Sequence, residues 1–188
     1  MSNMSKVTQT NSKAILVIDM IKGFTEKGSL YDPNIQRIVK PIANFLKINQ
    51  NEDIYFICDA HSESDLEMQN YPLHCLKGTN ESEIDDQLAK FAKPNKIYFK
   101  DTTNGFHHFP VEILKKYKEI VFVGCCTDIC VLQFVLSLKT YFNKEKIQTQ
   151  IVVYENLVDT FNSETHNRDL MHEFALRLME NAGVKIKR

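Results

Sequence analysis

Short apolar segments alternate with amphipathic segments along almost the whole chain. The segment from Ala14 to Ile18 is apolar at every position and rich in β-branched residues, which is typical of a strand buried on both faces of a parallel sheet. Comparable segments run from Ile54 to Cys58, Lys96 to Phe99, Glu119 to Gly124, Gln150 to Tyr154 and Val184 to Lys187. The pattern therefore predicts a sheet of about six strands.

Amphipathic segments that predict helices separate these strands. The first begins with Asp32 as N-cap and Pro33 in the first turn. Its apolar positions follow at helical spacing: Ile35, Ile38, Val39, Ile42, Phe45 and Leu46. Further helices are predicted near residues 83–92, 110–117, 128–142 and 164–182, the last ended by Gly183. Strands that alternate with helices predict one three-layer α/β/α domain with a mainly parallel, Rossmann-like sheet.

Composition supports a single folded domain. With 188 residues, of which 43% are hydrophobic and 25% charged, the chain can bury one sizeable core, and it is neither disordered nor collagen-like in character. Residues 1–12 are rich in Ser, Asn and Thr and are predicted to be a disordered lead-in. The domain is therefore expected to span residues 13–188.

Charge and hydropathy exclude several classes of partner. Lysine and arginine number 23 against 24 acidic residues, and this net charge of -1 gives no basic field for nucleic acid or an anionic membrane. The apolar runs, of which Ala14 to Ile18 is one, are far shorter than the ~20 residues that a bilayer helix needs. Because the N-terminal residues also lack the apolar centre of a secretion signal, we expect a cytoplasmic protein with a small-molecule partner.

The five cysteines are an odd number in a chain expected to stay reduced, which favours free thiols over disulfides. Cys58 and Cys75 flank other potential metal ligands. No C-x-x-C pair or zinc-finger spacing accompanies them, so a structural zinc site is not predicted.

Reactive side chains follow four of the predicted strands at their carboxyl ends. Asp19 ends the first, Asp59 and then His61 follow the second, and Lys100 ends the third. The fourth leads into the cysteine-rich segment 124–130. Because ligands bind at the carboxyl ends of parallel strands, the sequence predicts a functional site at this edge of the sheet.

The segment 124–130 is the candidate nucleophile loop. Cys130 lies near the first turn of a predicted helix, where free N–H groups and the helix dipole favour a thiolate and can stabilise an oxyanion. Spacing alone leaves Cys126 and Cys130 both open as nucleophile, and either could instead be a buried apolar residue. Asp19 and Lys100 are the available base and cation, unless they form only a salt bridge that closes the rim.

Carboxylate and imidazole groups between the second and third strands form a candidate metal loop. Asp59, His61, Glu67 and His74 combine ligand types that suit Zn, Mn or Fe with open positions. Asp-x-His is a common pattern, and a loop histidine is often only a surface residue.

The remaining histidines carry weaker signals. His107 and His108 are predicted to be a solvated helix lead-in with at most a minor role toward the substrate. His166 and His172 are predicted on the exposed, polar side of the last helix. No G-x-G-x-x-G or Walker loop is present, so the sheet lacks a phosphate-binding motif.

The chain contains four motifs whose sequences and order resemble those of the isochorismatase-like cysteine hydrolases and, within them, the nicotinamidase (pyrazinamidase) family. The resemblance extends from Ala14 to about Gly183. It rests on Val17-Ile18-Asp19-Met20 with Phe24 and Gly28-Ser29-Leu30, on Asp59-Ala60-His61 with Tyr71-Pro72-Leu73-His74-Cys75 and Gly78-Thr79, on Lys100 with Gly105-Phe106, and on Gly124-Cys125-Cys126-Thr127-Asp128-Ile129-Cys130.

The resemblance implies a role for each catalytic position. Cys130 would be the nucleophile, Asp19 the acid and base, and Lys100 its partner. A cis peptide would join Cys125 to Cys126, and the backbone N–H groups of Cys126 and Cys130 would form the oxyanion hole.

The family also implies a metal site and a ring-binding pocket. One divalent ion, zinc foremost with manganese or iron as alternatives, would be bound by Asp59, His61, His74 and Glu67. The expected substrate contacts are Phe24, Tyr71, Phe106 and Cys125.

The implied activity is hydrolysis of nicotinamide to nicotinate and ammonia through a thioester, a step of pyridine nucleotide salvage toward NAD. Another amidase of the superfamily, acting on a carbamoyl or ureido compound, is the first alternative. A catalytically idle metal-binding or partner-binding domain is the second, and a homo-oligomer stays open.

Overall fold

Six parallel strands form one continuous sheet in the computed structural model, which describes residues 12–188. The strands are β1 (Lys13–Ile18), β2 (Asp53–Asp59), β3 (Ile97–Lys100), β4 (Glu119–Cys125), β5 (Gln150–Asp159) and β6 (Lys185–Lys187). Their order across the sheet is β3-β2-β1-β4-β5-β6, and every pair is parallel. The predicted α/β class is confirmed. Of the predicted lead-in, residues 1–11 lie outside the described residues.

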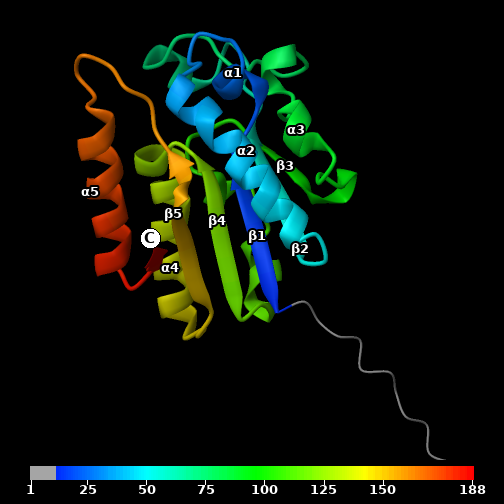
Figure 1. Ribbon diagram of the computed structural model, residues 1–188, viewed down its shortest axis with the longest axis vertical. Helices are drawn as coiled ribbons and strands as arrows, with labels where there is room; N and C mark the ends of the chain where they lie inside the picture. The colour runs from blue at the N-terminus through cyan, green and yellow to red at the C-terminus, as the bar shows by residue number, and fades with distance from the viewer. Residues whose placement is uncertain (1–11) are drawn as a thin grey trace, which may run out of the picture.

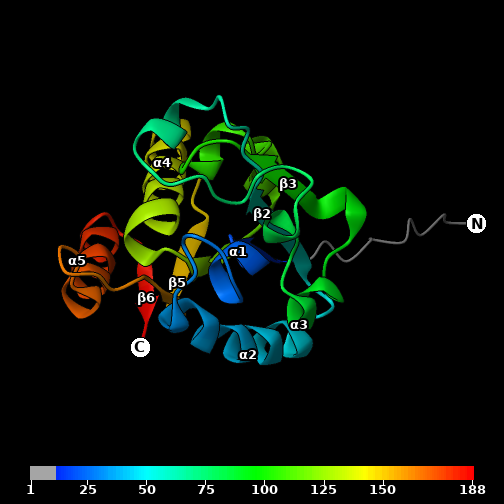
Figure 2. The same cartoon turned by 90° about the horizontal axis from the view of Figure 1, so that it is seen from above.

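Helices cover both faces of this sheet, as Figures 1 and 2 show. They are α1 (Lys22–Thr25), α2 (Pro33–Ile48), α3 (Asp86–Ala89), α4 (Leu132–Glu145) and α5 (Arg168–Asn181). Helix α2 lies on one face, whereas α4 and α5 pack on the other. Shorter 3-10 turns occupy the connections at Leu66–Gln69, Asn80–Ser82, Pro94–Lys96, Gly105–His107 and Val111–Lys116. No described helix has the length and apolar character needed to span a bilayer.

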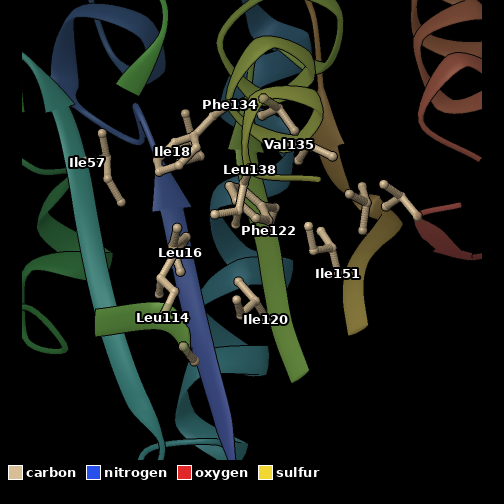
Figure 3. Close-up of a cluster of buried hydrophobic side chains, with 14 of the residues drawn as sticks. Leu16, Ile18, Ile57, Leu114, Ile120, Phe122, Phe134, Val135, Leu138 and Ile151 are labelled. Carbon is tan, nitrogen blue, oxygen red and sulfur yellow. The ribbon is translucent and has the colours of Figure 1, made fainter. Parts of the chain in front are cut away.

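Side chains of β1 alternate between two hydrophobic cores, which explains why the strand is apolar at every position. Leu16 and Ile18 point toward α4, where they belong to the same cluster as Phe134 (Figure 3). Ile15 and Val17 point the other way and pack with the buried face of α2. A strand with both faces covered has no polar side to display.

Three helix predictions were wrong in type or extent. The segment 110–117 contains only a six-residue 3-10 turn, Val111–Lys116, which ends where Tyr117 takes extended backbone. The segment 83–92 contains only the four-residue α3, and the predicted helix 128–142 begins as a π-helical turn, Thr127–Val131, before α4.

Strand β5 extends five residues beyond its predicted end at Tyr154. The pairing of β5 with β4 shifts register between Phe122 and Gly124, where the partly exposed Glu155 lies in a bulge. Pairing resumes at Val158. The polar residues at this bulge interrupted the apolar pattern on which the prediction depended. The extension brings the segment after β5 to the carboxyl edge of the sheet.

Gly124 allows β4 to pass unusually close to β1. Its φ is +117°, and a Cβ atom at this position would collide with the backbone of Ile18. Glycine is therefore required here, directly before the cysteine-rich turn. Asp19, the first residue after β1, has a φ of 51° and donates its backbone N–H to Ile57 O at 2.9 Å. These contacts fix the direction in which the Asp19 side chain leaves the sheet.

Candidate active site

Three charged side chains are buried together at the carboxyl ends of β1, β2 and β3. Asp19, Asp59 and Lys100 are at most 3% exposed. The Lys100 Nζ lies 2.9 Å from Asp19 Oδ2 and also contacts Asp59 Oδ1. Asp19 Oδ1 accepts the backbone N–H of Asp59 at 2.9 Å. One ammonium therefore holds two carboxylates, and the parallel strands that bring them together were predicted from the sequence.

The Cys130 thiol completes this group. Its Sγ lies 3.8 Å from Lys100 Nζ, and the Asp19 carboxylate also acts on it electrostatically. Burial raises the pKa of Cys130 well above its ordinary value, although the Lys100 ammonium lowers it. This direction is opposite to the lowered pKa expected from the sequence, because desolvation outweighs the effect of the Lys100 ammonium.

Asp19 is suited to exchange a proton with this thiol. Burial, together with the negative charge of Asp59, raises the pKa of Asp19 to about 7, while Lys100 acts in the opposite direction. A carboxyl group with a pKa near neutrality can accept a proton in one step and donate it in the next. The site can therefore generate a thiolate at the moment of attack.

The turn that carries Cys130 has an unusual backbone. The peptide bond between Cys125 and Cys126 is cis, as the family resemblance implied. The carbonyl of Cys126 accepts the N–H groups of Ile129 and Val131, each at 3.1 Å, within the π-helical turn. The Cys125 Sγ donates to Asp19 O at 3.3 Å, which ties the turn to the end of β1.

Three candidate metal ligands converge beside Lys100. One atom each of Asp59, His61 and His74 lies within 4.8 Å of the other two, and all three residues are buried. The His61 Nε2 is 3.4 Å from Asp59 Oδ1, and the His74 Nε2 is 3.8 Å from Asp59 Oδ2. The other ring nitrogens face Asp65 Oδ2 at 3.2 Å and Pro72 O at 2.8 Å. Such partners leave both Nε2 atoms directed at one point.

Electrostatics favour the ligand forms of Asp59 and His74, whereas the pKa of His61 is raised, because its bonds to Asp59 and Asp65 outweigh its burial. Burial lowers the pKa of His74, which keeps its imidazole neutral. Burial alone would raise the pKa of Asp59, but Lys100 and His61 lower it, so Asp59 is a carboxylate. A carboxylate with imidazoles is a donor set that zinc and similar divalent ions bind.

Glu67 does not join the other predicted ligands. Its two carboxylate oxygens accept the backbone N–H of Thr103 at 3.0 and 2.9 Å, and one also accepts the Thr103 hydroxyl at 3.2 Å. Asp65, which orients His61, was not singled out from the sequence. Its position four residues after His61 was the available signal, and its carboxylate also accepts the Ser62 N–H at 2.8 Å.

A cavity of about 260 Å³ opens onto both the thiol and the metal cluster. The predicted contacts Phe24, Tyr71 and Cys125 line it, together with Cys126, Cys130 and His74. Phe24 and Tyr71 have ring centroids 5.9 and 6.2 Å from that of His74.

Phe106, the remaining predicted contact, does not line this cavity. It packs against Phe134 and Tyr141 of α4, because the turn Gly105–His107 directs its ring into the core. Phe161 and Asn162, which lie after β5, were not predicted and do line the cavity.

The two histidines expected on the surface of the last helix are placed otherwise. His172 is 6% exposed, and its Nδ1 lies 2.9 Å from the Thr127 hydroxyl. His166 precedes α5 and hydrogen bonds to Asp128. Both predictions were wrong because α5 packs on the turn that carries Cys130, and that contact could not be inferred from the helix pattern.

A buried thiol, carboxylic acid and lysine lie together at the carboxyl edge of a parallel α/β sheet, an arrangement suited to nucleophilic attack by the thiol. The chain belongs to the isochorismatase family, since the model of the isochorismatase domain matches residues 13–186. The resemblance found in the sequence motifs is thereby confirmed.

Individual relatives cover almost the whole chain. Nicotinamidase 1 of Arabidopsis thaliana is 25% identical over 213 residues, which cover 96% of this chain and 87% of that protein. The crystal structure of a pyrazinamidase/nicotinamidase from Streptococcus mutans superposes with a TM-score of 0.77 at 25% identity and covers 93% and 99% of the two chains. A pyrazinamidase of Pyrococcus horikoshii in complex with zinc shares the fold, with a TM-score of 0.74, 21% identity and coverage of 94% and 99%.

Proposed function

We propose that this protein is a metal-assisted amidohydrolase that converts nicotinamide to nicotinate and ammonia. The observation that carries the proposal is the joint opening of the Cys130 thiol and the cluster of Asp59, His61 and His74 into one small cavity. Its 260 Å³ fall just below the ~300–1,000 Å³ usual for pockets that bind drug-sized ligands, which favours a small substrate. The reaction would belong to pyridine nucleotide salvage toward NAD, in the cytoplasm.

The first half-reaction forms a thioester. Asp19 takes the proton of the Cys130 thiol, and the sulfur attacks the carboxamide carbon. The oxygen that becomes negative accepts hydrogen bonds from the backbone N–H groups of Cys126 and Cys130. Asp19 then returns the proton to the amide nitrogen, the C–N bond breaks, and ammonia leaves.

The second half-reaction releases the acid. Asp19 removes a proton from a water molecule, which attacks the thioester carbon, and the C–S bond breaks. The Cys130 sulfur leaves as a thiol after it takes up the proton from Asp19. The Lys100 Nζ, 2.9 Å from Asp19 Oδ2, keeps this carboxyl group in place in both half-reactions. It also lies 3.8 Å from Cys130 Sγ and stabilises the negative charge that develops on the sulfur.

The metal cluster would position the substrate. Asp59, His61 and His74 form a buried set of one oxygen and two nitrogen donors, which fits zinc foremost, with manganese or iron as alternatives. A divalent ion held there would supply a Lewis acid that binds the pyridine nitrogen and orients the ring. The rings of Phe24 and Tyr71 lie beside His74 and offer the pyridine ring apolar contacts.

Ammonia release from nicotinamide by zinc-loaded protein tests the proposal. Cys130→Ala is expected to abolish release, whereas Cys58→Ala is expected to retain it, because Cys58 packs in the core on the α2 side and does not line the cavity. A ureido or carbamoyl compound is assayed in parallel.

The outcomes separate the candidate functions. Release only from the ureido or carbamoyl compound would identify another amidase of the family. Release from neither compound by metal-loaded protein would favour an idle binding domain. Activity that survives in Cys130→Ala would contradict the nucleophile assignment.

A further inference from the structure

The segment between β5 and α5 forms one side of the cavity and is held in a tight turn. Phe161 and Asn162 line the cavity, and Ser163 and His166 exchange two backbone hydrogen bonds at 3.0 and 3.2 Å. The Asn162 N–H donates to Asp32 Oδ2 at 3.2 Å, which anchors this turn to the start of α2. Figure 1 shows the segment rising from the end of β5 before the chain enters α5.

The imidazole of His166 covers one face of the Phe161 ring. The ring centroids are 3.9 Å apart and the planes differ by 12°, so the two rings are stacked. His166 Nδ1 lies 3.1 Å from the Phe161 carbonyl oxygen, and Nε2 lies 2.7 Å from Asp128 Oδ2. Both neighbours are acceptors, so an N–H of the imidazole can donate to Asp128 Oδ2. The ring is thus held between the Phe161 carbonyl and the Asp128 carboxylate.

Asp128 connects this pair to the nucleophile. It is the second residue of the π-helical turn that contains Cys130, and its side chain is only 7% exposed. Its other oxygen, Oδ1, is buried without a hydrogen-bond partner among residues 12–188. The hydrogen bond between Asp128 Oδ2 and His166 therefore connects the cavity wall to this turn.

We propose that His166 is a positioning residue that holds Phe161 as a specificity-determining wall of the substrate cavity. The imidazole fixes the Phe161 ring by stacking on it and by its contact with the Phe161 carbonyl oxygen. Its contact with Asp128 connects this wall to the turn that carries the attacking sulfur. A flat aromatic ring on this side favours a flat aromatic amide as substrate. The kinetic test of this inference rests on the proposed amidohydrolase function, whereas the fluorescence test does not.

A fluorescence experiment tests the positioning role without any substrate. The chain contains no tryptophan, so Phe161→Trp introduces a single reporter at the cavity wall. His166→Asn in this background removes the stacked ring and is expected to raise acrylamide quenching about twofold. The matched control is His108→Asn, which removes another histidine paired with an aspartate: His108 Nε2 lies 2.9 Å from Asp101, and neither residue lines the cavity.

Steady-state kinetics with zinc-loaded protein test the effect on the substrate. His166→Asn is expected to raise the KM for nicotinamide about threefold to tenfold and to change kcat by less than about twofold. The reason is that the substrate loses a ring contact while the reacting groups stay in place. Phe161→Ala is expected to do the same. In the Phe161→Ala background, His166→Asn should add less than about twofold, since His166 acts through Phe161.

The outcomes either support the role or overturn it. Equal quenching of the reporter with and without His166, or KM effects of the two substitutions that multiply, would overturn it. A fall in kcat at unchanged KM would likewise show that His166 does not act on the cavity wall. If wild-type protein releases no ammonia from nicotinamide, the proposed function fails, and the quenching result still decides the positioning role.

Discussion

Replacing Lys100 by methionine is expected to leave two buried carboxylates without the cation that they share. Methionine has a similar length and no charge, so the change removes the ammonium with little loss of volume. At 2.9 Å and an effective dielectric constant of ~20, the attraction between Lys100 and Asp19 is about 6 kcal/mol before desolvation is considered. Losing one partner of a buried ion pair lowers the free energy of unfolding by ~3–5 kcal/mol, and we expect a loss in this range.

A second substitution shows whether the unpaired charge causes this loss. Asp19→Asn in the Lys100→Met background removes one of the two carboxylates, so the double variant should be about 1–2 kcal/mol more stable than Lys100→Met alone. Neither variant should release ammonia from nicotinamide, because Asp19 and Lys100 both act at the thiol. Stability would then rise from the single to the double variant while activity stays absent.

Urea denaturation followed by far-ultraviolet circular dichroism measures the stabilities, with EDTA present so that no divalent ion compensates Asp59. Arg177→Met is the control, since Arg177 pairs with Glu173 at 2.7 Å on the surface and its loss should change stability by less than ~1 kcal/mol. If Lys100→Met is as stable as that control, or if the two site substitutions destabilise additively, the buried charges are not coupled as described.

Two further predictions concern histidines. Asp65→Ala is expected to weaken zinc binding about 10–100-fold by releasing His61, whereas Glu67→Gln should leave it unchanged, and calorimetric titration of the metal-free protein with zinc distinguishes the two. Burial lowers the pKa of His172 in the folded state, so below its unfolded value of ~6.5 the unfolded chain binds a proton that the folded chain excludes, and stability falls as pH falls. Urea titrations at about pH 7 and about pH 5.5 should therefore show a smaller loss in His172→Gln than in wild type, and an equal loss would contradict the burial argument.

The sheet and most of its helices could be predicted because their signal is local. A strand covered on both faces must be apolar throughout, and β1 has this pattern, while α2 shows both its N-cap and its buried stripe. Parallel strands also place their carboxyl ends at one edge, so the proximity of Asp19, Asp59 and Lys100 could be predicted from the sequence. The end of β5 was missed because polar residues pass through a bulge inside the strand.

The sequence by itself determined which reactive side chain follows which strand: the two acids, the lysine and the cysteine-rich turn. Only the tertiary structure decided that Glu67 accepts hydrogen bonds from Thr103, that Phe106 packs against α4, and that the segment between β5 and α5 places Phe161 at the cavity. It also decided that Cys130 is buried, which raises the pKa of its thiol. The physical reason is that side-chain direction and desolvation depend on neighbours far away in the chain, whereas hydrophobic periodicity depends on residues close in sequence.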